Sequence, residues 1–194
     1  TYMELPEFDG TPAGFKEALS RAKLVKRRAN QVLRLTTVYV KLRRALGKAG
    51  LDETTGFLVA ANSNIEYFCG FTGSYGFLLI SPDSAVLYTD GRYTTQAKTQ
   101  ALGVAVCEST QRPLDQLISD LKKQRVRRLG VEENRISYAL VQTLRRQLRR
   151  TRIEPLNGLV EQLRLVKTAD EIQKIRRAAR LNSRAFDDVC ARAS

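Results

Sequence analysis

Between residues 55 and 156, short apolar segments alternate with segments whose apolar residues recur at helical spacing. The clearest local signal is "GFLLISPDSAVLYTD", in which two apolar runs flank the sequence SPDS at residues 81–84. Pro and Asp favour a turn, so this stretch predicts an antiparallel hairpin. Along the chain we expect a helix, three or four mostly antiparallel strands, and then alternating helices and strands. This order predicts an α/β fold with a mixed β-sheet covered by helices.

The individual elements follow from local composition. Strands are expected at "TGFLVAA" and "SNIEYFCGF", which are rich in aromatic and β-branched residues, and later at "GVAVCES", "RRLGVEE" and "TRIEPL". Helices are expected at "RYTTQAKTQAL", at "PLDQLISDLKKQR" and at "SYALVQTLRRQLRR", the last beginning at a Ser137 cap. Two more are expected upstream, one after Thr11 and Pro12 and one over residues 36–50.

A final helix is predicted near the end of the chain. Thr168 is followed three residues later by Glu171, which is the capping box that opens a helix. No Gly, Asn or Pro stop signal follows in the last residues. We therefore expect a chain that breaks off inside an amphipathic helix.

Composition excludes several kinds of chemistry. The sequence contains no histidine, so a Ser-His-Asp triad, a Cys-His pair and every zinc site that uses histidine are excluded. The three cysteines, Cys69, Cys107 and Cys190, are far apart, which fits reduced thiols in a cytoplasmic protein better than a disulfide framework. No apolar run approaches the roughly 20 residues that cross a bilayer, so no membrane partner is expected.

The chain is strongly basic, with a formal net charge of +13. The charge is concentrated in residues 16–48 and 122–152, where Lys and Arg are interleaved with Leu and Val at helical spacing. One interpretation is the solvated face of amphipathic helices, and the other is a surface that binds polyanions. A basic nucleic-acid-binding α/β module is therefore the alternative function. Nucleic acid is not the expected partner, because aromatic residues are not interleaved with the basic runs.

Glycines at positions 70, 73 and 76 punctuate the stretch "NSNIEYFCGFTGSYGFLLI". A phosphate-binding loop or a dinucleotide fingerprint needs a helix after the last glycine, but a strand is predicted there. Ser74 has neither the sequence context of a nucleophile elbow nor a histidine base. We therefore expect a turn between paired strands, in which Gly73 and Gly76 permit positive φ or close backbone approach.

Two pairs of neighbouring carboxylates are candidates for a metal or acid/base site. Asp187 and Asp188 are adjacent on a predicted helix, which splays their side chains about 100 degrees apart, and Glu132 and Glu133 end a predicted strand. Neither spacing places two carboxylates on one face. Both pairs are expected to be surface charge.

Five motifs stand in order between about Thr36 and Phe186. As written here they are "NIEYFCGF", "TGSYG", "LYTDGRYTTQA", "GVE" and "RLVKTADEIQKIRRA". In this order they resemble the N-terminal domain of the creatinase, prolidase and aminopeptidase P family, the pita-bread metallopeptidases. The resemblance implies a three-layer fold of the ribonuclease H-like type, a mixed sheet covered by helices. It also implies an N-terminal helical arm over residues 1–35, this domain over 36–160, and a linker with the first helix of a truncated catalytic domain over 161–194.

The resemblance implies a role without catalysis for this chain. In the family, the N-terminal domain supports a dimer or tetramer and walls the active site. The following domain holds two divalent metal ions, often manganese, with cobalt or zinc as alternatives. The expected function is thus the non-catalytic domain of a cytoplasmic Xaa-Pro aminopeptidase or dipeptidase, a hydrolase that acts on proline-containing peptides. No catalytic residue and no metal ligand of the family can be assigned to this sequence.

The resemblance also implies a substrate-access rim. The matching residues are Glu66, Tyr67, Thr72, Ser74, Tyr75 and Arg92. The alternative for all six is packing and hairpin geometry. Arg92 has a structural alternative of its own: after a tight turn at Asp90 and Gly91, it could pair with a carboxylate and fix the start of the next helix.

Overall fold

The structure is a computed structural model, and it describes residues 40, 42, 44, 46–47, 55–82, 84–107 and 111–193. The chain divides into two compact units, Thr1–Leu159 and Val160–Ser194. The helical arm predicted over residues 1–35 lies outside the described residues. Within the helix predicted over 36–50, each described residue is helical.

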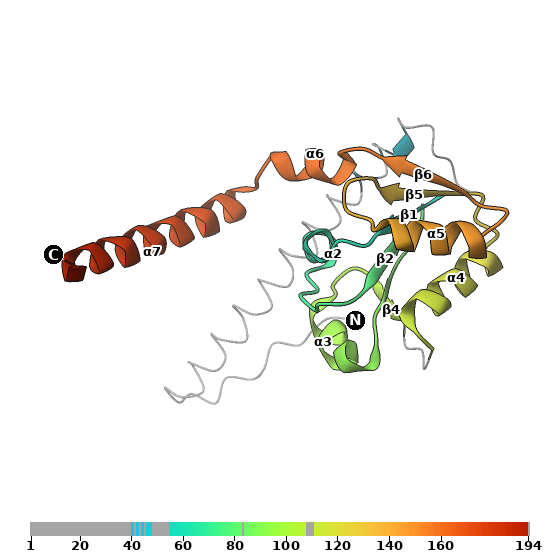
Figure 1. The fold of residues 1–194 in the computed structure, drawn as a ribbon, viewed down its shortest axis with the longest axis horizontal. Coiled ribbons are helices and arrows are strands. Elements are labelled where there is room, and N and C mark those ends of the chain that lie inside the picture. Colours follow the sequence, from blue (N-terminus) through green and yellow to red (C-terminus); the bar gives the residue numbers. More distant parts are fainter. Residues whose placement is uncertain are drawn as a thin grey trace, which may run out of the picture. The chain divides into compact units, whose positions relative to one another are not determined.

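The first unit is built on a six-stranded sheet with the order β4-β3-β2-β1-β5-β6 (Figure 1). The strands are β1 (Thr55–Val59), β2 (Phe77–Ile80), β3 (Ala85–Tyr88), β4 (Ala105–Cys107), β5 (Arg128–Glu132) and β6 (Arg152–Leu156). The helices described in this unit are α2 (Asn62–Cys69), the 3₁₀ helix η1 (Gly91–Tyr93), α3 (Thr94–Gln100), α4 (Pro113–Lys123) and α5 (Tyr138–Gln147). Helices α6 (Leu159–Leu165) and α7 (Ala169–Ala193) follow.

Strand direction makes the sheet mixed. β2 is antiparallel to both β1 and β3, whereas β3 with β4, β1 with β5, and β5 with β6 are parallel pairs. The predicted hairpin is confirmed, since Phe77 is in register with Tyr88 and Ile80 with Ala85. All strands except β2 therefore end at the same edge of the sheet.

The strand predicted at "SNIEYFCGF" is wrong, because residues 62–69 form helix α2. The buried residues Asn64, Ile65, Phe68 and Cys69 recur at the spacing of one helical face. Gly70 ends the helix with φ 79°, a left-handed conformation that favours glycine. The aromatic and β-branched residues that suggested a strand instead supply the apolar face of a short helix.

The other predicted elements of this unit are confirmed. Strands β1, β4, β5 and β6 and helices α3, α4 and α5 lie where the sequence predicts them. Ser137 caps α5, and its Oγ accepts a 3.2 Å hydrogen bond from the backbone N–H of Leu140.

Both faces of the sheet are buried. On one face, Leu58, Leu79 and Leu129 pack with Leu121 of α4 and Leu144 of α5. Strand residues of the opposite parity point to the other face. These residues, Phe57, Val59, Leu78, Ile80 and Leu87, are each at most 1% exposed. A mixed sheet that is covered on both faces confirms the predicted fold class.

β6 forms one edge of the sheet. Its Pro155, in register with Val131 of β5, has no backbone N–H to donate. Glu154 pairs with Arg128 of β5 at 2.8 Å and with Arg152 at 3.2 Å. The hydrogen bond from Arg128 is the main cause that lowers the pKa of Glu154 from its ordinary value.

The second unit contains α7, which opens with the predicted capping box. Glu171 Oε2 accepts a 2.9 Å hydrogen bond from the backbone N–H of Thr168, and Thr168 Oγ1 accepts a 3.3 Å bond from that of Glu171. Across the described helices, including α7, none is both long and apolar enough to cross a membrane.

Candidate functional site

The connections of the sheet diverge between β1 and β5. The chain leaves β1 toward β2 on one side, and it leaves β5 toward β6 on the other. In open α/β sheets, ligands bind in the crevice outside the carboxyl ends of strands at such a point. A hollow of about 500 Å³ lies there, lined by residues that include Ala60 after β1, Ser74 and Tyr75 before β2, and Arg135 and Ser137 after β5.

A buried carboxylate lies beside this crevice. Glu132 is the last residue of β5 and is 4% exposed. Its Oε2 accepts hydrogen bonds from the backbone N–H groups of Ala60 at 2.7 Å and Ala61 at 2.9 Å. Its Oε1 accepts a 2.5 Å bond from Nδ2 of Asn64. The negative charge thus sits at the start of α2, where the helix macrodipole favours an anion.

The surface position expected for Glu132 is therefore wrong, whereas its neighbour Glu133 is exposed as expected. Sequence reasoning missed Glu132 because a Glu at the end of a strand, beside a second Glu, carries no local signal of burial. The usable signal lay in the motifs themselves. Glu132 belongs to "GVE" and Asn64 to "NIEYFCGF", and the two motifs contact each other through this bond.

The loop over residues 70–76 carries three of the predicted rim residues. Thr72 ties the loop to α3, because both its backbone N–H and its Oγ1 donate to Gln100 Oε1 at 3.0 Å. Gln96 Nε2 in turn donates to Thr72 Oγ1 at 3.0 Å. Thr72 is therefore held in place by α3.

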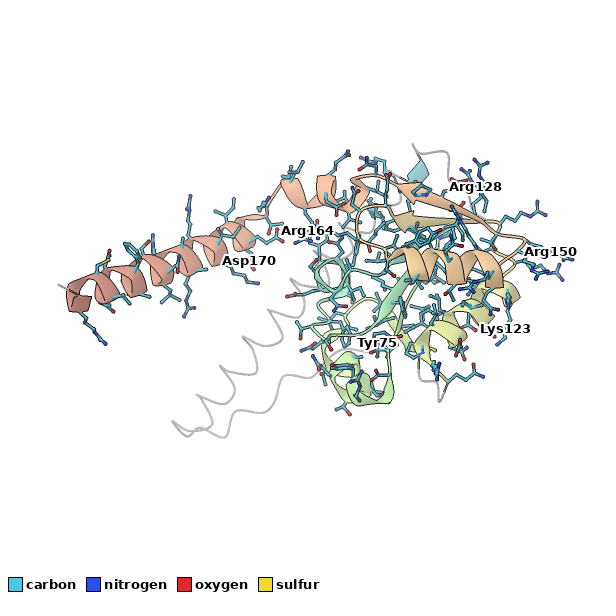
Figure 2. The ribbon with its side chains drawn as sticks, viewed as in Figure 1. Tyr75, Lys123, Arg128, Arg150, Arg164 and Asp170 are labelled. Carbon is cyan, nitrogen blue, oxygen red and sulfur yellow. The ribbon has the colours of Figure 1, made fainter. Side chains whose placement is uncertain are left out.

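Ser74 is held from two sides. Its Oγ lies 2.6 Å from the phenol oxygen of Tyr93, and its carbonyl accepts a 2.8 Å bond from Nδ2 of Asn62. The carbonyl of Tyr75 accepts a 2.7 Å bond from Oγ1 of Thr89. Tyr75, which is labelled in Figure 2, is 39% exposed and lines the hollow.

Arg92 pairs with a carboxylate at the start of the next helix, as its structural alternative predicts. Asp90 Oδ1 accepts a 3.0 Å bond from the backbone N–H of Arg92, and the guanidinium Nη2 lies 2.7 Å from Asp90 Oδ2. The side-chain hydrogen bond from Arg92 is the main cause that lowers the pKa of Asp90. The guanidinium also lies 5.4 Å from the ring centroid of Tyr93, which contacts Ser74. Arg92 thus fixes the start of η1, and a contact with substrate stays a prediction.

The remaining predicted residues, Glu66 and Tyr67, lie on α2 rather than on the loop. Glu66 is exposed, and its carbonyl accepts a 2.8 Å bond from the backbone N–H of Gly70. The ring of Tyr67 is half-buried and meets Phe68 edge-on at 5.5 Å. The structure therefore distributes the six residues over α2, the loop and η1.

The glycines of the loop allow neighbouring atoms to lie close to the backbone. A Cβ atom at Gly73 would overlap the ring of Phe71, and one at Gly76 would lie 3.2 Å from the carbonyl oxygen of Tyr88. Neither has positive φ, so of the two predicted reasons only close approach holds. The predicted turn between paired strands is wrong, because this loop joins α2 to β2.

The described residues do not form a metal centre of the family's kind. No group of three or more His, Cys, Asp or Glu side chains that could hold a metal ion occurs in the part of the chain that the structure describes. The sequence also has no histidine. The residues that the structure describes therefore do not fit a pair of divalent metal ions.

The fold and the loop over residues 70–76 together define an α/β domain that presents a polar, anchored loop at the carboxyl edge of a mixed sheet. Residues 40–166 match the family described as the creatinase/prolidase N-terminal domain, and the chain belongs to this family. The resemblance drawn from the five motifs is thus confirmed.

Individual relatives agree. The chain is 35% identical over 149 residues to the uncharacterized peptidase YqhT of Bacillus subtilis. The aligned region covers 77% of this chain and 41% of that protein. The fold is similar to that of the Xaa-Pro dipeptidase from Bacillus anthracis, with a TM-score of 0.74 and 30% identity over 81% of this chain and 43% of that one.

A solved N-terminal domain gives a third comparison. The N-terminal domain of the cytoplasmic peptidase PepQ from Mycobacterium tuberculosis has a TM-score of 0.56 and 32% identity, covering 66% of this chain and 98% of that one. The chain thus spans about two fifths of the length of the Bacillus relatives and nearly all of an isolated N-terminal domain.

Proposed function

We propose that this chain acts as the non-catalytic N-terminal domain of an Xaa-Pro metallopeptidase, similar to aminopeptidase P or prolidase. The family match over residues 40–166 is the observation that carries the proposal. The proposed organisation is an arm over 1–35, the domain over 36–160, and a linker with the first catalytic-domain helix over 161–194. The division of the chain into units after Leu159 supports the second boundary.

The proposed work of the domain is to shape access to a metal site in the catalytic domain. Loop 70–76 is anchored to α3 through Thr72 and to η1 through Ser74. A loop held in this way is preorganised. Binding of a peptide to the loop therefore costs little conformational free energy for ordering the loop. We propose that Ser74 and Tyr75 contact the end of a proline-containing peptide that lies farthest from the metal ions.

The metal ions, manganese or alternatively cobalt or zinc, belong to the catalytic domain in this proposal. If bound there, they would supply Lewis-acid activation of water for hydrolysis. Dimerisation and a cytoplasmic location belong to the same proposal. The residues of this chain bind and orient the peptide and limit which molecules enter.

A chimaera tests the access role. Residues 40–166 would replace the matching domain of the Bacillus anthracis Xaa-Pro dipeptidase, and hydrolysis of Xaa-Pro peptides would be measured. Ser74→Ala or Tyr75→Ala should raise KM about two- to tenfold, the effect of losing one hydrogen bond, with kcat changed much less. Thr95→Ala, at an exposed position on α3, is the matched control and should leave KM unchanged. An unchanged KM in all three variants would refute the access role.

A second experiment tests the absence of catalysis. The 194-residue chain, incubated with Xaa-Pro peptides and manganese, should show no hydrolysis above background. Turnover by the purified chain would overturn the proposal. Sedimentation of the same sample measures its oligomeric state, for which we expect a dimer.

A further inference from the structure

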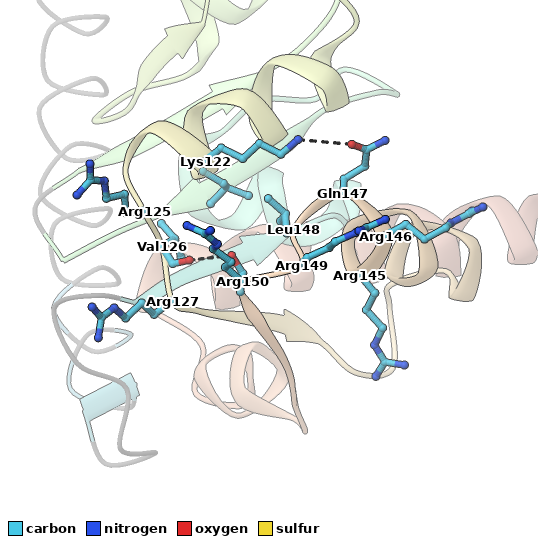
Figure 3. Close-up of a pocket in the computed structure, with 12 residues that line it drawn as sticks. Lys122, Arg125, Val126, Arg127, Arg145, Arg146, Gln147, Leu148, Arg149 and Arg150 are labelled. Carbon is cyan, nitrogen blue, oxygen red and sulfur yellow. Dashed lines mark hydrogen bonds between the residues drawn. The ribbon is translucent and has the colours of Figure 1, made fainter.

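A groove of about 1320 Å³ opens where β5 and β6 begin, at the opposite edge of the sheet from the candidate site (Figure 3). It is bounded by the carboxyl ends of α4 and α5 and by the segments that lead from them into β5 and β6. Thr151 Oγ1 donates a 2.7 Å hydrogen bond to the carbonyl of Val126 and so ties these two segments together. Across the groove, Lys122 Nζ of α4 donates to Gln147 Oε1 of α5 at 3.5 Å.

Among the described residues, the lining of the groove is strongly basic. Among its twelve residues are seven cations and no carboxylate; the cations are Lys122, Arg125, Arg127, Arg145, Arg146, Arg149 and Arg150. All seven are exposed. None of the six arginines forms an ion pair with a carboxylate of the described residues. Seven like charges around one hollow repel one another and create a strongly positive potential.

Helix termini explain only part of this charge. Lys122, Arg145 and Arg146 lie in the last turns of α4 and α5, where cations are favoured by the macrodipole. The two helix ends together offer roughly one negative charge. Arg149 and Arg150 lie beyond the end of α5, in the segment that leads to β6. Within the described residues, the positive charge at this groove thus exceeds what the two helix ends balance, and it favours a bound anion.

The remaining lining residues indicate which classes of anion fit the groove. Leu121, Val126 and Leu148 form a floor that is at most 9% exposed, so the groove offers no apolar pocket for a peptide side chain. No lining residue is aromatic, so nucleobases find no stacking platform. The guanidinium groups supply planar pairs of donors that match the oxygens of phosphate.

We propose that this arginine groove, defined by the seven cations named above, binds a linear inorganic polyphosphate. Each unit of such a chain is an anion, and its binding needs neither stacking nor apolar contact. The groove and the rim lie at opposite edges of the sheet, and Tyr75 and Arg150 stand on opposite sides of the first unit in Figure 2. The proposal therefore does not depend on the peptidase role.

The first test is a titration of the 194-residue chain with end-labelled, short-chain polyphosphate, followed by fluorescence anisotropy. Neutralising about four to seven phosphates at about 0.7 released counterions each predicts a slope of log affinity against log salt of roughly −3 to −5. Binding should persist at about 0.15 M salt. Absence of binding at that salt concentration would overturn the proposal.

Charge variants then locate the site. Arg149→Glu with Arg150→Glu should weaken binding by about tenfold or more, because two attractive charges become repulsive. The matched control is Arg176→Glu with Arg177→Glu, another adjacent and exposed arginine pair, on α7, with the same change in net charge. It should bind within about twofold of the original chain. A second groove variant, Arg145→Gln with Arg146→Gln, should also weaken binding. Circular dichroism confirms that each variant is folded.

Competitors identify the ligand class. Polyglutamate and a duplex RNA with the same number of phosphates should each displace the labelled polyphosphate at least tenfold less effectively. Equal or better competition by the RNA would assign the groove to nucleic acid, and equal competition by polyglutamate would assign it to acidic protein segments. Either result overturns the proposal, and so does equal loss of binding in the α7 control.

Discussion

Asn64 donates a 2.5 Å hydrogen bond from its side-chain amide to the carboxylate of Glu132, across 68 positions of sequence. Both residues are buried, with 0% of Asn64 and 4% of Glu132 exposed. The bond joins α2 to the end of β5. It therefore fixes the first turn of α2 beside the point where the connections of the sheet diverge. The loop that carries Ser74 follows directly after this short helix.

Glu132→Ala should lower the free energy of unfolding by about 3–5 kcal/mol, because one buried and two partly buried N–H donors lose their acceptor. Urea denaturation measures this change. Glu133→Ala removes the exposed neighbouring carboxylate and should stay within about 0.5 kcal/mol of the original chain. A double-mutant cycle with Asn64→Ala should give a coupling energy of about 0.5–3 kcal/mol. Equal stability of the two Glu variants would contradict the buried role of Glu132.

Gly73→Ala should destabilise the chain by about 1–3 kcal/mol, because the new Cβ would overlap the ring of Phe71 and force it to move. The matched control is Gly91→Ala, where an added Cβ meets nothing within 4 Å. Thermal unfolding compares the two. If Gly91→Ala costs as much as Gly73→Ala, close approach is not the reason for the glycine in the loop.

The cysteines should differ in reactivity. Burial raises the pKa of Cys69 to about 11, so its thiol stays protonated and shielded at about pH 8. Cys190 is exposed on α7. Iodoacetamide should therefore modify Cys190 first, and Cys190→Ser should remove the fast phase seen by mass spectrometry. Fast modification of Cys69 in the folded chain would show that α2 opens readily.

The ion pair of Glu154 should make stability depend on pH. Its folded pKa lies below the unfolded value of about 4.3, so its contribution is complete above that value and is lost as pH falls through the folded pKa. The stability difference between the original chain and Glu154→Gln should thus shrink as pH falls from about 6 to about 3. In an Arg128→Gln background the same comparison should vary less with pH. A difference that grows on acidification would contradict this assignment.

Local signals account for the elements that the sequence predicted. Ser137 and the box formed by Thr168 and Glu171 are capping residues that act within one turn, and the structure contains both sets of bonds. The hairpin of β2 and β3 rests on two apolar runs and a turn sequence between them. These features depend on neighbours in the chain, and they can be predicted without knowledge of the rest of the fold.

Helix α2 could not be predicted in the same way. Its N-cap residue is Ala61, which has no side-chain acceptor, and the anion at its start comes from Glu132, more than 70 positions further along the chain. The spacing of its buried residues and the glycine at position 70 were the available local signals. The aromatic and β-branched composition outweighed them and favoured a strand.

The same limit applies to the candidate site. The motifs placed Thr72, Ser74 and Tyr75 in one loop, but the partners that hold that loop come from α3, η1 and the start of α2. The need for glycine at position 73 depends on the ring of Phe71, which only the folded loop brings above it. The motifs predicted that these residues lie near one another, and tertiary contacts decide their geometry.

The outer border of β6 limits how two copies of this chain can associate. A foreign strand approaching there would meet Pro155, which lacks a donor, and would have to desolvate the charges of Arg152 and Glu154. Continuation of the sheet from one molecule into the next is therefore disfavoured on this side. Copies that meet at this strand must then associate through contacts between side chains rather than through a shared backbone ladder across β6.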